Sequence, residues 1–209
     1  MSLGIILLIA VGGLIYFGIA ERILDRLYLS DSIALLTIVL IIIGSRFDIT
    51  ISRSPLLTVN IGGAVIPLIL AIYVLLRANT SKEWLRTIFA SILTAAGIYG
   101  ISMFFSDFGH GRDIIDPMYI FGLTGGIIAY ILGRSRRGSF IAGTMGFLLF
   151  NLFLFWRTLS GQIVSETRIG GGGAFDSIII SGLLAVMIAE LVGESRERLA
   201  GGHLDNNDK

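Results

Sequence analysis

The sequence predicts an all-α integral membrane protein, a bundle of seven transmembrane helices, and three observations support this fold class. Charged residues make up only 15% of the 209-residue chain and hydrophobic residues 54%, whereas a typical soluble domain carries about 25% charged residues. The mean hydropathy is +0.85. The charges also cluster between long apolar segments, and these segments lack the alternation of apolar and polar residues that membrane-spanning strands show.

Seven apolar segments account for the predicted helices, and their lengths suit a bilayer. In chain order they cover residues 3–20, 32–45, 60–76, 87–105, 116–133, 139–156 and 174–193. A helix needs about 17–25 residues to cross roughly 30 Å of hydrocarbon, so the short second segment is expected to extend by a turn. The first segment has no basic stretch before it and no small-x-small cleavage pattern, which predicts a retained span rather than a cleaved signal.

Local helix signals agree with these boundaries. The third segment begins at Asn60, a residue type favoured at a helix N-cap, and proline at Pro67 is expected to kink it. The fifth begins with Asp116 followed by Pro117, and proline is favoured at the first helical position. The seventh follows the glycine run 170–173, which predicts an irregular entry to that helix.

Lysine and arginine predict the orientation of the bundle. One set of loops and ends holds eleven basic residues: Arg22, Arg26, Arg77, Lys82, Arg86, Arg134, Arg136, Arg137, Arg196, Arg198 and Lys209. The opposite set holds five: Arg46, Arg53, Arg112, Arg157 and Arg168. Because the richer side faces the cytoplasm, the N-terminus is expected outside and the C-terminus inside, in a multi-pass protein of the inner (plasma) membrane.

Residues 1–198 are predicted to form one transmembrane domain, and 199–209 a disordered cytoplasmic tail. A weak internal similarity suggests a parallel repeat. "AVGGLIYF" at 10–17 resembles "LTGGIIAY" at 123–130, and "IGGAVI" at 61–66 resembles "GGGAFD" at 171–176. These matches favour a 3+1+3 layout, in which two three-helix repeats are joined by the fourth helix, as in some small transporters.

Composition also excludes several kinds of function. A net charge of +1 gives no support for nucleic-acid binding. The absence of cysteine excludes disulfides, thiolate nucleophiles and thiolate metal ligands. Two isolated histidines, His110 and His203, disfavour a histidine zinc site, and the sequence names no cofactor. The expected partners are the lipid bilayer and a small cation, proton or solute, with a homo-oligomer left open.

Asp176 is the principal candidate site residue. Thirteen residues separate it from Glu190, and that much helix is only about 20 Å long, so both carboxylates cannot lie comfortably outside the hydrocarbon. Glu190 can extend toward the arginines that follow it, whereas the shorter Asp176 side chain cannot. Irregular backbone at membrane depth survives only when buried in protein or lining a wet cavity. The alternative is that Asp176 is an ordinary helix cap in a flexible loop.

Two further polar residues begin helices on the same membrane face. Asp116 and Asn60 occupy cap positions of the fifth and third segments, and they are expected to converge with Asp176 on one outward-facing cavity. Gly172 and Gly173 would add backbone carbonyl oxygens. The alternatives are that Asp116 is a plain cap and that the small residues after Asn60 serve helix packing.

Several motifs together resemble a known family. "AERILDRLYLSD", "VNIGGAVIP", "DPMYIFG", "GRSRR", "GGGAFD" and "AELVGESRER" are similar to an uncharacterised domain-of-unknown-function family of bacterial and archaeal multi-spanning proteins. This resemblance implies an integral membrane protein and no particular chemistry. "GGAFD" is also loosely similar to the G-x-G-D motif of intramembrane aspartyl proteases, although Phe175 replaces the last glycine.

The sequence leaves three functions open. The first is a small transporter or ion- or proton-coupled carrier, in which Asp176 and Asp116 bind a cation or proton and Asn60 adds a neutral oxygen. The second is an intramembrane aspartyl protease that uses Asp116 and Asp176 as a catalytic dyad sharing one proton. The third is a non-catalytic membrane scaffold.

Overall fold

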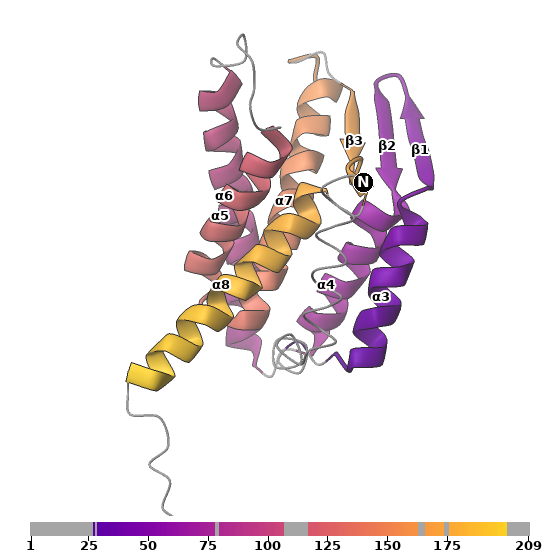
Figure 1. The fold of residues 1–209 in the computed structure, drawn as a ribbon. Helices are drawn as coiled ribbons and strands as arrows, with labels where there is room; N and C mark the ends of the chain where they lie inside the picture. Colours follow the sequence, from indigo (N-terminus) through magenta and orange to yellow (C-terminus); the bar gives the residue numbers. More distant parts are fainter. Residues whose placement is uncertain are drawn as a thin grey trace, which may run out of the picture.

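Most described residues of the chain are helical, and a small sheet lies at one end of the helices (Figure 1). The computed structural model describes residues 27, 29–77, 80–106, 117–162, 166–173 and 176–199. The elements are α3 (Asp31–Gly44), β1 (Asp48–Arg53), β2 (Leu56–Asn60), η1 (Ile61–Val65), α4 (Ile66–Leu76), α5 (Ser81–Ser106), α6 (Pro117–Gly133), α7 (Arg136–Leu159), β3 (Thr167–Ile169) and α8 (Ser177–Leu199).

These helices correspond to six of the seven predicted segments. The boundaries of α3 and α6 differ from the expected 32–45 and 116–133 by one residue at most. The other helices differ by up to six residues, because α5 begins at Ser81, before the apolar stretch, and α8 continues to Leu199, beyond it. The first predicted segment, 3–20, and most of the predicted tail lie outside the described residues.

The sheet was not predicted. β1 and β2 form an antiparallel hairpin, and β3 pairs with β2 in parallel, so that Leu57 lies opposite Thr167 and Val59 opposite Ile169. The strand order is β1-β2-β3. The sheet therefore joins the loop that follows α3 to the loop that precedes α8, two segments more than a hundred residues apart in the sequence.

The third predicted segment has two parts. Its first turn, η1, is a π-helix, and the α-helix α4 begins at Ile66 with Pro67 in its first turn. Proline at that position lacks only an N–H that the start of an α-helix leaves without an i−4 partner. The sequence predicts a kink at Pro67. In the structure, the helix changes from a π-helix to an α-helix immediately before this proline.

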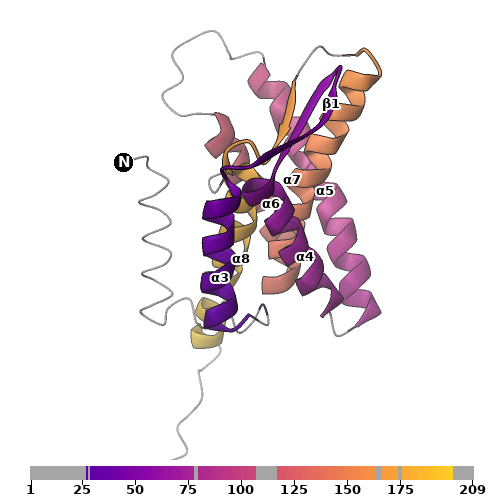
Figure 2. The same cartoon turned by 90° about the vertical axis from the view of Figure 1, so that its right-hand side faces the viewer.

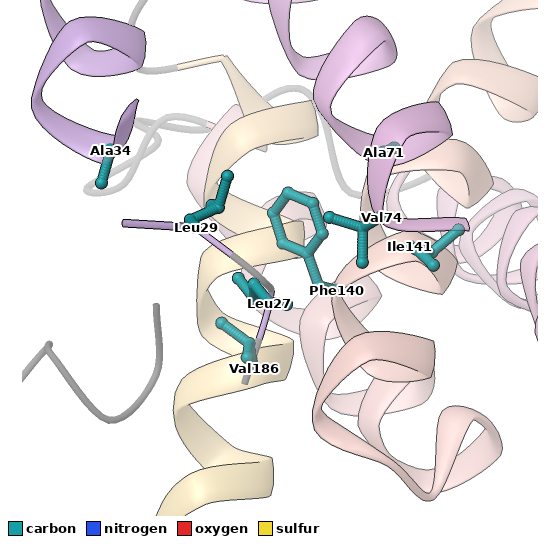
Figure 3. Close-up of a cluster of buried hydrophobic side chains, with 8 residues drawn as sticks. All are labelled: Leu27, Leu29, Ala34, Ala71, Val74, Phe140, Ile141 and Val186. Atoms are coloured by element: carbon teal, nitrogen blue, oxygen red, sulfur yellow. The ribbon is translucent and has the colours of Figure 1, made fainter. Parts of the chain in front are cut away.

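α7 is the central helix of the bundle. It packs against α4, α5, α6 and α8, and Figure 2 shows it between the neighbouring helices. Phe140 of α7 fills the space between α4, α8 and the segment before α3, where it packs with Val74, Val186 and Leu29 (Figure 3). Small residues from α5, α6, α7 and α8 form a second contact: Ala90, Ala129, Ala142 and Ala185.

The outward faces of the helices carry many large apolar side chains. Leu36 and Ile43 of α3, Leu76 of α4 and Phe89 of α5 are 55–77% exposed. Among the described residues, two helical stretches, Ser81–Met103 and Arg136–Leu159, are long and apolar enough to cross a membrane, and four shorter apolar helices accompany them. Exposed apolar surface of this extent marks contact with lipid or protein rather than water.

Candidate functional site

Asn60 is buried at the start of η1, as its sequence position predicts. Its side chain is 3% exposed, and its Oδ1 accepts a hydrogen bond from the Gly63 N–H at 2.8 Å, which makes it the N-cap. Its Nδ2 donates to the Ser45 carbonyl oxygen at 3.1 Å and to Asp48 Oδ1 at 2.8 Å. Both ends of the amide are therefore engaged, and they connect the end of α3, the start of β1 and η1.

Asp176 is buried at the start of α8, with 7% of its surface exposed. Its Oδ1 accepts from the Ile178 N–H and its Oδ2 from the Gly172 N–H, each at 3.0 Å. The first bond is an ordinary helix cap. The second connects the carboxylate back to the glycine turn, so that each carboxylate oxygen accepts one backbone N–H.

The glycine turn packs directly on the start of η1. Gly170 and Gly173 have φ values of +73° and +61°, a backbone conformation that residues other than glycine rarely adopt. A methyl group on Gly63 would collide with the Gly170 carbonyl oxygen and lie 2.8 Å from the Gly173 carbonyl oxygen. A methyl group on Gly173 would lie 2.9 Å from Ser45 Cβ. We name this contact the glycine junction: Gly44, Ser45, Gly62, Gly63, Gly170 and Gly173.

At the glycine junction the start of η1 contacts the turn that precedes α8, and the convergence of the Asn60 and Asp176 side chains on one cavity stays a prediction. Asn60 caps the helix that contains Gly63, and Asp176 caps the helix that follows Gly173, so one backbone contact separates the two caps. Asp116 lies outside the described residues. Its convergence with Asp176, and the catalytic dyad that depends on that convergence, stay predictions. Gly172 and Gly173 lie in the turn as expected, and their role as cation ligands also stays a prediction.

Two further residues of this region, Asp48 and Ser45, were not predicted from the sequence. Asp48 begins β1, and its Oδ1 accepts a hydrogen bond from the Asn60 Nδ2. Ser45 packs between Gly62 and Gly173 and donates its hydroxyl to the Ile41 carbonyl oxygen at 2.6 Å. A signal for Asp48 was present, because Phe47, Ile49 and Ile51 alternate with polar residues, and this period indicates a strand.

Buried hydroxyl groups lie in the core between α5, α7 and α8. The side-chain oxygens of Thr94, Ser139, Thr144 and Ser181 have no hydrogen-bond partner among the described residues, and each residue is at most 1% exposed. Some of them lie against glycine backbone: a methyl group on Gly125 would lie 2.9 Å from Ser181 Oγ. Weak Cα–H···O contacts of this kind help helices pack closely.

At the end of the bundle opposite the sheet, Glu190 is paired with Arg136 across α7 and α8. The Arg136 Nε contacts Glu190 Oε2, and both side chains are less than one-fifth exposed. The sequence predicts that Glu190 extends toward Arg196 and Arg198, whose side chains the structure does not describe. Among the described residues, no three His, Cys, Asp or Glu side chains gather closely enough to hold a metal ion.

Comparison with known proteins gives one result. No curated protein and no solved structure matches the chain. A family model described as a protein of unknown function, DUF1614, matches residues 30–188. That match includes Asn60, Asp176 and every residue of the glycine junction, and it covers well over half of the 209 residues. The chain therefore belongs to the DUF1614 family.

Proposed function

We propose that this protein is a multi-pass membrane protein, a small carrier coupled to a cation or proton that binds near the extracytoplasmic face. The proposed fold is the seven-helix bundle with its N-terminus outside and its C-terminus inside, and two parallel three-helix repeats. Exposed leucine, isoleucine and phenylalanine side chains on the outer faces of α3, α4 and α5 support a lipid environment. Trp84 and Trp156, near opposite ends of the helices, are 41% and 55% exposed and suit the two interfaces.

The buried carboxylate of Asp176 is the observation that carries this proposal. Burying an acid among apolar helices costs free energy, and in membrane proteins such groups mark ion or proton sites. Here it lies at an irregular helix start, beside a glycine turn that contacts a second irregular start capped by Asn60. Broken helix starts of this kind form the binding sites of many carriers.

The neighbouring groups favour a cation or a proton over an anion. The buried polar side chains of these helices offer oxygens: the Asp176 carboxylate, the Asn60 amide and the Thr94, Thr144 and Ser181 hydroxyls. Hard cations prefer such oxygen ligands.

Flux through proteoliposomes tests this proposal. The purified protein is reconstituted, and a sodium or pH gradient is imposed while radioactive sodium uptake or a pH-sensitive dye in the lumen is followed. We expect a flux of one of these two cations, and Asp176→Asn should reduce it by at least about tenfold, the effect of losing roughly 1.4 kcal/mol of binding. Asparagine can still cap α8 through its side-chain oxygen, so the variant is expected to fold.

Glu166→Gln is the matched control, because it removes one carboxylate from the same end of the bundle at a side chain that is 62% exposed. It should retain the wild-type flux. A wild-type protein that moves neither sodium nor protons would contradict the proposal. So would a folded Asp176→Asn variant with undiminished flux.

A further inference from the structure

A cavity lies at the end of the bundle opposite the sheet, between α6, α7 and α8. Its volume is about 240 Å³, and its lining residues are Tyr130, Arg134, Ser135, Arg136, Ala189, Val192 and Gly193. We name it the arginine cavity. It is smaller than the roughly 300–1,000 Å³ of sites for drug-sized ligands, so it suits a group of few atoms.

Arg134 has a left-handed backbone conformation at the turn between α6 and α7. Its φ is +54°, and it is the one non-glycine residue with positive φ among the described residues. Such a conformation is unfavourable for an L-residue and persists only where its surroundings hold it. Here the Arg86 Nη2 donates to the Gly133 carbonyl oxygen at 2.7 Å, and the Ser135 hydroxyl caps α7 by accepting from Gly138 N–H at 3.0 Å. This tight turn brings Arg134 and Arg136 to the same cavity.

Arg136 is held in place on the far wall. Glu190 pairs with its guanidinium, and the absence of a side chain at Gly193 makes room for it, since a methyl group there would lie 3.1 Å from Arg136 Nη2. Glu190 offsets one of the two arginine charges and leaves an excess of one positive charge at the cavity. The first turn of α7 adds the positive end of its dipole. The Arg134 backbone N–H donates to the Tyr130 carbonyl oxygen at 3.3 Å, whereas its exposed guanidinium has no hydrogen-bond or ion-pair partner among the described residues.

We propose that the arginine cavity binds a phosphate group. Guanidinium groups bind phosphate through paired N–H···O bonds, and the Tyr130 hydroxyl on the same wall can donate another hydrogen bond. The phosphate has two sources, the headgroup of an anionic lipid or a free phosphate in the cytoplasm. The arginine-rich end is the one predicted to face the cytoplasmic leaflet, where anionic lipids attract basic groups. This proposal does not depend on transport at Asp176.

Arg134→Gly tests the proposal without an expected folding defect. Glycine adopts positive φ readily, so this substitution removes the guanidinium and relieves the backbone at once. Arg137→Gln is the matched control, because it removes a charge three residues away on the same turn but outside the cavity lining.

The experiment measures two kinds of phosphate binding on the whole purified chain. In one arm, the protein is equilibrated with mixed phosphatidylglycerol and phosphatidylcholine, and the retained lipid is counted by native mass spectrometry. In the other, inorganic phosphate is added in a neutral detergent and the midpoint of thermal unfolding is followed, with sulfate-free chloride at equal ionic strength as the reference.

Preferential retention of phosphatidylglycerol identifies a lipid headgroup, and a higher unfolding midpoint with inorganic phosphate identifies a soluble phosphate. In either case, Arg134→Gly should weaken the preference by about tenfold, the size of one charge-assisted contact, and Arg137→Gln should keep it. If neither probe binds, or if the two variants lose binding equally, the proposal is overturned.

Discussion

Gly63 lies where the start of η1 contacts the turn before α8, and the close contact there requires a residue without a side chain. Its Cα lies against the carbonyl oxygens of Gly170 and Gly173, so the turn before α8 can approach η1 only because neither side carries a Cβ. Asn60 and Asp176, the caps on the two sides, are held in position by this approach. At the residue scale, the glycines set the geometry of the site and the polar residues supply its chemistry.

Gly63→Ala should therefore destabilise the protein by about 1–3 kcal/mol, the cost of forcing an extra methyl group into a packed contact. The free energy of unfolding in mixed micelles is the measurement. Gly100→Ala is the control, because a methyl group on Gly100 in α5 meets nothing within 4 Å, and alanine is favoured over glycine in a helix by roughly 0.5–1 kcal/mol. Equal unfolding free energies for the two variants would contradict the close approach at Gly63.

The sheet is the element that organises this end of the bundle. β3 has only three residues, yet its parallel pairing with β2 connects the segment before Asn60 to the segment before the glycine turn. The two irregular helix starts therefore cannot move far apart without breaking the β2–β3 ladder.

Cysteine pairs test that ladder. Thr58 and Arg168 are neighbours across β2 and β3, so Thr58→Cys combined with Arg168→Cys should form a disulfide under mild oxidation. The native chain contains no cysteine, which makes intramolecular cross-links simple to detect by mass spectrometry after proteolysis. Thr50→Cys with Arg168→Cys is the control: Thr50 lies on β1, two strand spacings or roughly 10 Å away, beyond disulfide reach. Equal cross-linking of both pairs would contradict the strand order.

The helices were largely predictable from the sequence, and the sheet was not. α3, α4 and α6 follow from their apolar segments, because an apolar run of this length is a local signal. β3 carries no such signal, since three residues pair only because distant β2 lies beside them. Asp176 could be singled out as a candidate site residue from its own segment, because the glycine run and the spacing to Glu190 are local signals. The packing of the glycine turn on Gly63 depends on a long-range contact that no local pattern contains.

The whole molecule has two chemically different ends. The sheet, Asn60 and Asp176 lie at one end, and the turn from α6 to α7, with Arg134, Arg136 and the pair to Glu190, lies at the other. α3 ends and α4 begins beside the sheet, as do α7 and α8 (Figure 1). Consecutive helices thus run in opposite directions between these ends, as a bundle that repeatedly crosses a bilayer requires.

Labelling of single cysteines in intact cells tests the orientation. Glu166→Cys, at the sheet end, should react with a membrane-impermeant maleimide. Lys82→Cys, an exposed position at the start of α5, should react only after the cells are permeabilised. The cysteine-free parent gives the background. Reaction of Lys82→Cys alone in intact cells would reverse the orientation, and reaction of both would contradict a membrane barrier between the ends.

β1 forms the outer edge of the described sheet, with backbone N–H and C=O groups that no further described strand pairs. In the proposed membrane arrangement such groups are excluded from hydrocarbon, so β1 would begin at or above the lipid boundary, as would Asn60, which pairs in register with Asp48. Transfer of one charge across the full membrane potential amounts to about 2.3 kcal/mol per 100 mV. An ion arriving at Asp176 from this side would cross little of that voltage, so its arrival should be almost insensitive to the electric field, and the field would act on the passage between the helices beyond it.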